Sequence, residues 1–495
     1  MLNAARTVVV FGILMQLAGF AKMLIVAAHF GAGPDLDAYY LGLIIPAFLI
    51  GLSSGILQTT FIPAYVSAKA RHDAMAAARW RNVALTWTAL VMAAIAAIFT
   101  LGQQPAQQLL GSGIDASVRV AMQTTFVVLM WTAPLNCVAD GMALLLNAEG
   151  KFLVAASAPL ANIVVSAAAL LIWPHSVHAL SWGLLVGLCT QTAMVVWALH
   201  RLGIHVRPML APRSVLPGSL PLLTPVLIST VCGNFGLAFI QWYSGRAGAG
   251  AISALGYATR LHNTVVQAVV MSVSVVLLPH FARLIAENRH AELRSTLERV
   301  FAATVVFFLA AMAFVAASGH SMVAFLLERG AFRSEDTDLV ALTWLGLTSG
   351  LLGATWGIFL QRYFQALQEP WVIARLLVVS MVGNVGFTVL LLPSLGVVGV
   401  AFGSSIAYLV VTAGFHWKAG RRLGSLFSPS MRGFTLRAVV LNVVAYLLAV
   451  LWARVLGDSA AIIVIAGQGV IIGAANLLAM HAEPLKISVQ MLLRR

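Results

Sequence analysis

Three charged residues lie inside long apolar stretches of this 495-residue sequence: Lys22, Asp140 and Arg260. A charge at the centre of a membrane helix costs about 2.5–3.5 kcal/mol, so it should face a partner or a water-filled cavity. Two cations and one carboxylate leave a net positive interior, which suits an anionic ligand such as a phosphate or diphosphate group. In a purely structural alternative, Asp140 neutralises one of the cations and only joins helices.

Uncharged polar residues such as Gln16 and Asn234 also enter the apolar stretches, where such side chains commonly hydrogen-bond between helices. The sequence lacks a GxxxxGK[ST] loop, an HExxH motif and a GxSxG elbow, so we expect neither a nucleotide-driven pump nor a hydrolase. Its three cysteines show no metal-ligand spacing, and we expect no cofactor and no metal. The remaining energy sources are the membrane potential, an ion gradient or the substrate gradient.

The elements that position these residues must be membrane-spanning helices. Hydrophobic residues make up 60% of the sequence and charged residues only 9%, against roughly 25% in a soluble domain. The apolar residues form blocks of spanning length. The sequence predicts an all-α integral membrane protein with about fourteen transmembrane helices, near 7–30, 38–62, 83–101, 120–146, 152–173, 178–199, 215–243, 251–279, 300–318, 339–361, 372–392, 396–416, 433–453 and 459–481.

The distribution of basic residues predicts the orientation of these spans. With a cytoplasmic N-terminus, 23 of the 30 Lys and Arg residues fall on the cytoplasmic side and 5 on the opposite side, and Lys22 and Arg260 lie within spans. This bias follows the positive-inside rule and places both termini in the cytoplasm. The net charge of +14 therefore indicates a membrane surface rather than nucleic acid as a partner.

The sequence also repeats itself at an offset of about 220 residues. The stretch 61–83 resembles 277–300, Asn162 corresponds to Asn384, and the HRLG stretch at 200–203 corresponds to RRLG at 421–424. We therefore expect two six-helix lobes, 1–210 and 211–424, and two additional helices in 425–495. An even number of spans per repeat predicts a pseudo-two-fold axis along the membrane normal, with the substrate site between the lobes.

Four motifs carry a resemblance to a known family. The stretch GFAKMLIVAAHFGAGPDLDAYYLGLIIP at 19–46 resembles a GFARD…FGAG…DAFF…P pattern, and YATRLHN at 257–263 resembles YADRL. SVVLLPHFARL at 274–284 and LLERGAF at 326–332 resemble the patterns TxLLPxLS and LFxRGxF. In this order the motifs resemble the MurJ (MviN) family of lipid II flippases, within the multidrug, oligosaccharidyl-lipid and polysaccharide exporter superfamily.

The resemblance implies a flippase that carries an undecaprenyl-diphosphate-linked sugar-peptide from the cytoplasmic to the periplasmic leaflet by alternating access. Basic residues of the family's central cavity fall on Lys22 and Arg260, and an aspartate at the start of span 2 falls on Asp37. The family's other charges are replaced, by Gln16 in span 1, by an apolar run at 48–51, and by Ser54 and Thr259. Acidic residues that bind sodium in some members fall on the neutral Asn234 and Asn384.

We therefore expect a transporter rather than an enzyme in the bacterial inner membrane, with Lys22, Arg260, Asp37, Gln16 and Asp140 at the substrate and Asn234 and Asn384 as ion-coupling candidates. Its partners would be a lipid-linked glycan, lipid II first, and membrane lipids, with the cell-wall synthesis machinery as a further candidate. The alternatives are a flippase for an exopolysaccharide or O-antigen repeat unit and a drug antiporter. A membrane enzyme would need a large external loop or a carboxylate-rich catalytic loop, and the acidic loop here is only 328–338. A non-transporting scaffold in a cell-envelope complex is a further alternative, because this chain lacks some of the family's cavity charges.

Overall fold

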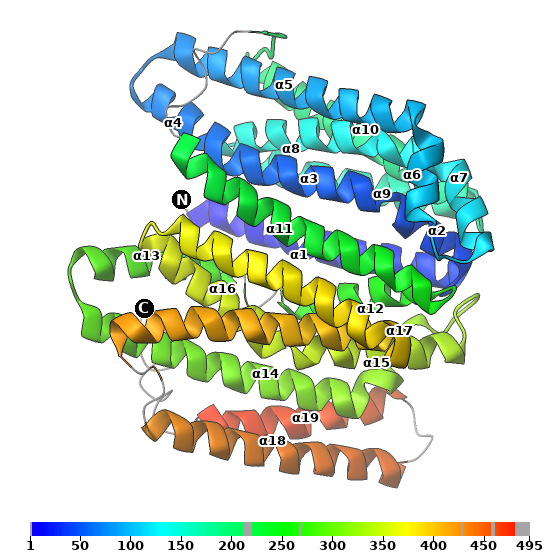
Figure 1. Cartoon of the computed structure of the whole chain (residues 1–495), viewed down its shortest axis with the longest axis vertical. Helices are drawn as coiled ribbons and strands as arrows, with labels where there is room; N and C mark the ends of the chain where they lie inside the picture. The colour runs from blue at the N-terminus through cyan, green and yellow to red at the C-terminus, as the bar shows by residue number, and fades with distance from the viewer. Residues whose placement is uncertain are drawn as a thin grey trace. The chain divides into compact units, whose positions relative to one another are not determined.

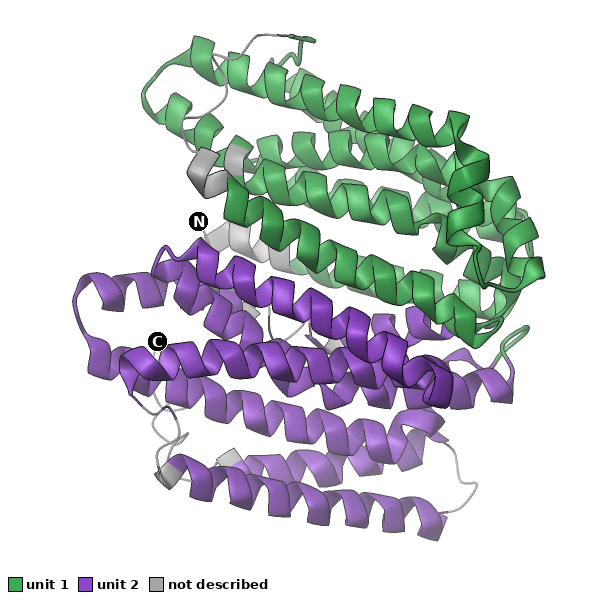
Figure 2. Cartoon of the chain, in the orientation of Figure 1, with its two compact units in different colours: residues 1–253, 329–332 green, residues 254–328, 333–495 purple. Residues whose placement is uncertain are grey.

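The computed structural model describes residues 2–210, 220–266, 270, 272–424, 426, 429–456 and 461–480, and every element in this part of the chain is a helix (Figure 1). The all-α membrane fold expected from the composition is therefore confirmed. The chain packs as two compact units (Figure 2). Unit 1 comprises Met1–Ser253 and Arg329–Phe332, and unit 2 comprises Ala254–Glu328 and Arg333–Arg495.

Unit 1 holds the first eleven α-helices and the start of the twelfth. Among its described residues, buried apolar side chains cluster around α2, α3, α7 and α8 and again where α4, α8 and α10 meet. The elements are α1 (Leu2–Phe30), α2 (Pro34–Gly42), α3 (Ile44–Ile56), the π-helix η1 (Leu57–Phe61), α4 (Ile62–Ala70), α5 (Ala74–Leu101), α6 (Gln103–Leu110), α7 (Ala116–Met130), α8 (Thr132–Ala148), α9 (Phe152–Ile172), α10 (Val177–Arg201), α11 (Leu220–Ser244) and the 3-10 turn η3 (Gly245–Ala247).

Unit 2 is built on α14, which packs against α15, α18 and α19. A buried aromatic and aliphatic core joins α13, α14, α16 and α17. The elements are α12 (Ala251–Val266), α13 (Ser272–Ala286), α14 (His290–Leu327), α15 (Ser334–Ser349), α16 (Leu351–Ala366), α17 (Pro370–Leu423), α18 (Pro429–Leu456) and α19 (Ala461–Met480).

Two prolines explain where spans of unit 1 are interrupted. A proline inside a helix lacks an N–H donor, and its ring clashes with the carbonyl four residues earlier. The helix α2 ends at Gly42, four residues before Pro46, and α7 ends at Met130, four residues before Pro134. The chain resumes helical geometry after Leu43 and after Trp131, so each break divides one membrane span into two helices.

The 54-residue helix α17 is a hairpin of two helices. Gly396 has φ 58° and ψ −145°, a conformation that residues with a side chain rarely adopt, and the chain reverses there. Glycines then allow close antiparallel contact, since added Cβ atoms at Gly399, Gly403 and Gly414 would meet Leu391, Phe387 and Leu376. The two residue numbers of each contacting pair add up to the same value, as they must where two helices of one hairpin run antiparallel. The expected spans 372–392 and 396–416 are these two helices.

A row of glycines on α15 and α16 lets these helices pack closely on the second helix of α17. Small residues at such spacing allow backbones to approach in membrane helix pairs. Added Cβ atoms at Gly350 and Gly353 would meet the backbones of Ser405 and Leu409. The hydroxyl of Ser405 donates to the carbonyl of Gly346 at 2.7 Å, and that of Thr412 donates to Gly353 at 2.7 Å.

The count of fourteen spans is not confirmed. Eleven helices in the described part of the chain are long and apolar enough to cross a membrane, or twelve if the bent pair Ser334–Ser349 and Leu351–Ala366 forms one span. That count treats Pro370–Leu423 as one helix. The expected span 251–279 covers α12 and α13, and the residues between them lie partly outside the described residues.

The expected lobes follow the sequence repeat, whereas the two units follow packing. Helix α11 packs against α3 in unit 1, although the repeat assigns it to the second lobe. The boundary at 210/211 adjoins residues 211–219, which lie outside the described residues, as does the C-terminal segment 481–495 whose cytoplasmic location was expected. The division into lobes 1–210, 211–424 and 425–495 therefore stays a prediction.

Candidate functional site

The first helix of unit 1 carries two of the expected substrate-binding residues, Gln16 and Lys22. Both side chains are half-buried. Six residues of helix separate them by about 9 Å along the axis and about 120° around it. They therefore lie on different faces of α1, a helix that packs against α9.

Asp37 lies in α2, and its carboxylate is buried against the first turn of α12. It accepts hydrogen bonds from the backbone N–H of Gly250 at 2.6 Å and of Ser253 at 2.7 Å, and a short one from the Ser253 hydroxyl. Only 1% of its surface is exposed. A carboxylate at a helix N-terminus satisfies orphan N–H donors and the positive end of the helix dipole. In this conformation Asp37 joins α2 to the first turn of α12, and its role at the substrate stays a prediction.

Asp140 lies in α8 and is half-buried. Its carboxylate accepts a hydrogen bond from the hydroxyl of Ser54 on α3 at 3.1 Å. Ser54 was noted in the sequence as the replacement of a family glutamate, and its contact with Asp140 became visible only once α3 and α8 were placed together. The pair forms one polar contact between two apolar helices of unit 1.

Asn234 lies on the face of α11 that packs against α3. Its Nδ2 donates to the carbonyl of Thr230 at 2.8 Å, and an added Cβ at Gly51 would meet Asn234 Oδ1 at 2.0 Å. One turn further, an added Cβ at Gly55 would meet Thr230. Asn234 therefore fills the space over the Gly51–Gly55 row, where small residues let the two helices approach.

Arg260 lies in α12 within unit 2, and its side chain is half-buried. Its backbone carbonyl accepts a hydrogen bond from Thr264 at 2.9 Å. Among the residues that the structure describes, none forms an ion pair or side-chain hydrogen bond with the guanidinium. A cation that apolar helices half-enclose without a counter-charge is poised to bind an anion.

Asn384 is buried in the first helix of the α17 hairpin. Its Nδ2 donates to the carbonyl of Ser380 at 2.9 Å, but its Oδ1 meets no donor among the described residues. The hydroxyl of Thr388, one turn further along the same helix, also lacks a partner there. Buried polar atoms are rarely left unpaired, so this face of α17 is a candidate for a function beyond packing.

The expected site residues thus divide between the units. Unit 1 contains Gln16, Lys22, Asp37, Asp140 and Asn234, and unit 2 contains Arg260 and Asn384. Asp37, Asp140 and Asn234 each contact a neighbouring helix of their own unit. The described residues contain no group of three or more His, Cys, Asp and Glu side chains that could hold a metal ion. A shared substrate site for Lys22 and Arg260 stays a prediction.

Sequence reasoning missed a segment that crosses between the units. Residues 329–332, which we call the RGAF strap, belong to unit 1, although the residues on both sides belong to unit 2. The N–H of Ala331 donates to the carbonyl of Ala28 at the end of α1 at 2.8 Å, and Phe332 is 2% exposed. Gly330 has φ 64°, and an added Cβ would meet Ala28 O at 2.2 Å. Gly330 in the LLERGAF motif is the sequence feature that could have indicated this close backbone contact.

Comparisons of the sequence with a family model and with known proteins agree on one family. The family model described as "Lipid II flippase MurJ" matches residues 26–465. A "Probable lipid II flippase MurJ" of Rhizobium meliloti (strain 1021) is 27% identical over 413 residues, which cover 79% of this chain and 75% of that protein. A "Lipid II flippase MurJ" of Burkholderia cenocepacia is 27% identical over 412 residues, with 79% and 78% covered.

Solved structures share the fold. The structure titled "Lipid II flippase MurJ, inward closed conformation" superimposes with a TM-score of 0.80 at 16% identity and covers 95% of this chain and 97% of its own. An inward-facing multidrug resistance MATE family transporter has a TM-score of 0.71 at 18% identity, with 83% and 95% covered. The family model spans nearly all of the membrane helices, including those with Arg260 and Asn384, and the chain belongs to the lipid II flippase MurJ family.

Proposed function

We propose that this protein carries lipid II from the cytoplasmic to the outer leaflet of the bacterial inner membrane. The observation that supports it most strongly is the match of the lipid II flippase family model to residues 26–465. Relatives that cover most of the chain carry the same description. The family match favours this cargo over an exopolysaccharide or O-antigen unit and over a drug, because the MATE transporter shares only the fold.

Arg260 is the residue that we assign to the diphosphate. Its guanidinium is half-buried and has no partner among the described side chains, and Arg binds phosphate oxygens through paired hydrogen bonds. Lys22 would add a second positive charge from α1. The lipid tail would stay in the bilayer while the charged head group crosses, so the transport step needs no covalent chemistry and the protein acts as a transporter rather than an enzyme.

Complementation tests this assignment. In a host depleted of its own lipid II flippase, this chain should restore growth, and Arg260→Ala should abolish the rescue. Loss of a charge-assisted hydrogen bond costs about 1.5–3 kcal/mol, or roughly 10- to 150-fold in binding. The matched control is Arg454→Ala on the exposed end of α18, which should still rescue. Full rescue by Arg260→Ala would overturn its role. Failure of the well-expressed wild-type chain would overturn lipid II as cargo.

The proposed direction of transport rests on the orientation of the chain. The excess of Lys and Arg on one side places both termini in the cytoplasm. Single cysteines introduced at exposed loop positions, one near Arg207 and one near Arg333, should react with a membrane-impermeant maleimide from opposite sides. Labelling of both from the same side would contradict the topology.

We also propose that the cycle is driven by the membrane potential or an ion gradient. Moving one charge through the potential supplies about 2.3 kcal/mol per 100 mV. The unpaired Oδ1 of Asn384 and hydroxyl of Thr388 support a step in which oxygen atoms of α17 contact a cation. Flipping in proteoliposomes should fall when the potential and the ion gradients are collapsed together. An unchanged rate would leave the substrate gradient as the driving force.

A further inference from the structure

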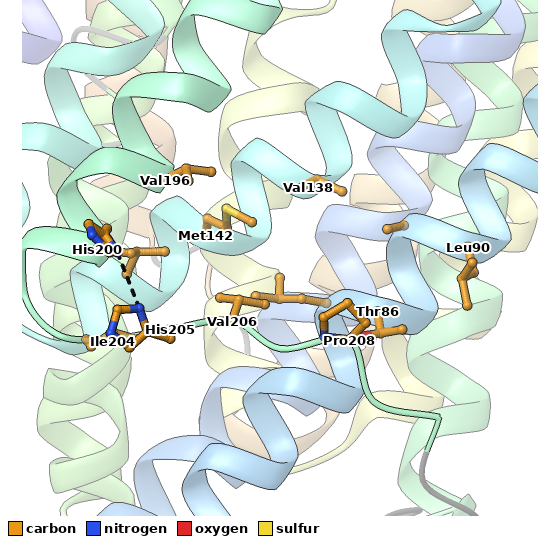
Figure 3. A pocket seen from close by; sticks show the side chains of 13 residues that line it. Thr86, Leu90, Val138, Met142, Val196, His200, Ile204, His205, Val206 and Pro208 are labelled. Carbon is orange, nitrogen blue, oxygen red and sulfur yellow. Dashed lines mark hydrogen bonds between the residues drawn. The ribbon is translucent and has the colours of Figure 1, made fainter.

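Unit 1 contains a cavity of about 440 Å³ between α5, α8 and α10. This volume lies within the range of small-molecule sites, which is about 300–1,000 Å³. The walls are apolar, and Figure 3 shows Leu90, Val138, Met142 and Val196 around the interior. None of the residues expected to contact the cargo or a coupling ion lines this cavity. Leu90 and Val196 are 48% and 44% exposed, so the cavity opens onto the surface of unit 1.

The segment that follows α10 closes one end of the cavity. Residues 204–209, which we call the linker strap, run along α5, and Ile204, His205, Val206 and Pro208 line the cavity (Figure 3). Side chains of α5 hold the linker strap by hydrogen bonds to its backbone. These run from Arg81 Nη2 to His205 O at 2.9 Å, from Arg207 N to Asn82 Oδ1 at 3.3 Å, and from Met209 N to Thr86 Oγ1 at 3.1 Å.

Basic residues lie at and around the end closed by the linker strap. The rings of His200 and His205 line it, with their Nδ1 atoms 3.3 Å apart. Exposed Arg201 and Arg207 flank these histidines in the chain. The Arg201 guanidinium lies 4.7 Å from the ring centre of Trp197, which is 57% exposed. Exposed tryptophan marks the level of lipid head groups in membrane proteins, so the apolar cavity begins at the head-group level and extends toward the hydrocarbon.

We propose that this cavity binds one anionic phospholipid, with an acyl chain between α5, α8 and α10 and the phosphate at the end formed by the linker strap. The apolar walls match an acyl chain and exclude a sugar or nucleotide, whose polar groups would be left unpaired. The basic end favours an anionic head group, since positive charge near a membrane surface attracts anionic lipid by about 1 kcal/mol per residue. The site is separate from the proposed transport residues, and its assignment to the cytoplasmic leaflet follows the proposed orientation.

Native mass spectrometry of the purified full chain tests the acyl-chain half of the proposal. After incubation with equal amounts of phosphatidylglycerol and phosphatidylcholine, the wild-type protein should retain one molecule of phosphatidylglycerol in preference to phosphatidylcholine. In Ala89→Phe, which fills the cavity, the fraction of protein that carries this lipid should fall about tenfold or more. The control Val440→Phe adds the same ring at an exposed position of α18, 54% exposed in the wild type, and should retain it. Equal retention by both variants would overturn the site.

A second variant tests the head-group half without altering the helix packing. Arg201→Gln combined with Arg207→Gln removes two exposed charges and leaves the backbone bond of residue 207 to Asn82 in place. Phosphatidylglycerol affinity should fall roughly 30-fold, and phosphatidylcholine retention should not change. The proposal of an anionic ligand would be overturned if the variant lost affinity equally for both lipids, or if the wild-type protein preferred phosphatidylcholine. This variant also keeps the proposal falsifiable if Ala89→Phe does not fold.

Discussion

The α9–α10 hairpin of unit 1 and the α17 hairpin of unit 2 occupy matching positions in the sequence repeat, but their asparagines differ. Asn162 in α9 donates to Gln191 on α10 at 3.2 Å, and its Oδ1 accepts from Ser166 at 3.1 Å. Asn384 uses only its Nδ2, and its Oδ1 is buried without a partner among the described residues. The first hairpin uses its asparagine to join two helices, whereas the second leaves an oxygen atom available.

The basic segments of the repeat differ in a similar way. In unit 1, Lys69 on α4 reaches Glu149 at the end of α8 at 2.7 Å, and Tyr65 donates to the same carboxylate. In unit 2, Arg283 and Arg289 pair with Glu287, all within one short stretch of chain. In these two matching segments, unit 1 therefore uses its charged groups for a contact distant in sequence, whereas unit 2 pairs them locally. Sequence similarity between repeats does not fix which side chains carry the packing.

The largest expected effect concerns the close contact inside the α17 hairpin. In Gly399→Ala the added Cβ would lie 2.4 Å from Leu391 O, an atom of the backbone that cannot rotate away. We expect a loss of about 3 kcal/mol or more, measured by thermal unfolding in detergent. The control is Gly386→Ala on the same hairpin, where an added Cβ meets nothing within 4 Å and stability should hold or rise. Equal stability of both variants would contradict the hairpin contact.

The two asparagines should respond differently to the same substitution. Asn162→Leu leaves the buried Oε1 of Gln191 without its donor and should destabilise the protein by about 1–3 kcal/mol. Asn384→Leu removes an oxygen atom that already lacks a partner, so stability should change by less than about 1 kcal/mol. Unfolding in detergent compares the two. If Asn384→Leu were the more damaging, the difference between the hairpins would be reversed.

Transport should show the opposite order. If Asn384 contacts a coupling ion, Asn384→Leu should lower flipping in proteoliposomes about tenfold while the protein remains folded. Asn162→Leu, compared at equal amounts of folded protein, should flip at close to the wild-type rate. Wild-type flipping by Asn384→Leu would show that the unpaired oxygen has no part in transport, and the coupling proposal would be withdrawn.

The smallest effect concerns Glu149 and pH. Burial alone would raise the pKa of its carboxyl, but hydrogen bonds from Lys69 and Tyr65 outweigh this and lower it from the ordinary 4.5. A lowered folded-state pKa stabilises the protein above the unfolded-state pKa, and that contribution is lost as pH falls through the folded value. Below pH ~4.5 the free energy of unfolding should therefore fall slightly less in Glu149→Gln than in the wild type, by under about 1 kcal/mol.

Glu287 provides the matched case in unit 2. Hydrogen bonds from Arg283 and Arg289 lower the pKa of its carboxyl, but the ion pairs lie on the exposed surface. Glu287→Gln should leave the unfolding temperature unchanged at pH 7 and at pH 4, since exposed ion pairs contribute little. A larger effect than that of Glu149→Gln would contradict the view that, of these two basic segments, the one in unit 1 carries the contact that matters for stability.

The helical class and most helix positions follow from the sequence, because apolar blocks of spanning length leave the backbone only helical solutions in a membrane. The expected spans 38–62 and 120–146 contain no breaks, although Pro46 and Pro134 lie within them and each lacks the N–H donor that a continuous helix needs. Burial of Asp37 against Gly250 and Ser253 was not visible in the sequence, because a contact more than 200 residues apart depends on packing. The sequence placed Asp37 at the substrate. The structure shows it capping α12.

The RGAF strap also bears on the order in which the chain can fold. Synthesis proceeds from the N-terminus, so all of residues 254–328 must be made before the strap can reach the end of α1. Unit 1 is thus incomplete until part of unit 2 exists. A single cut cannot divide the gene into two parts that each encode one complete unit. A cut before the RGAF strap removes it from unit 1, and a cut after it leaves residues 254–328 of unit 2 on the first fragment. Split versions of this protein should therefore require co-expression to accumulate.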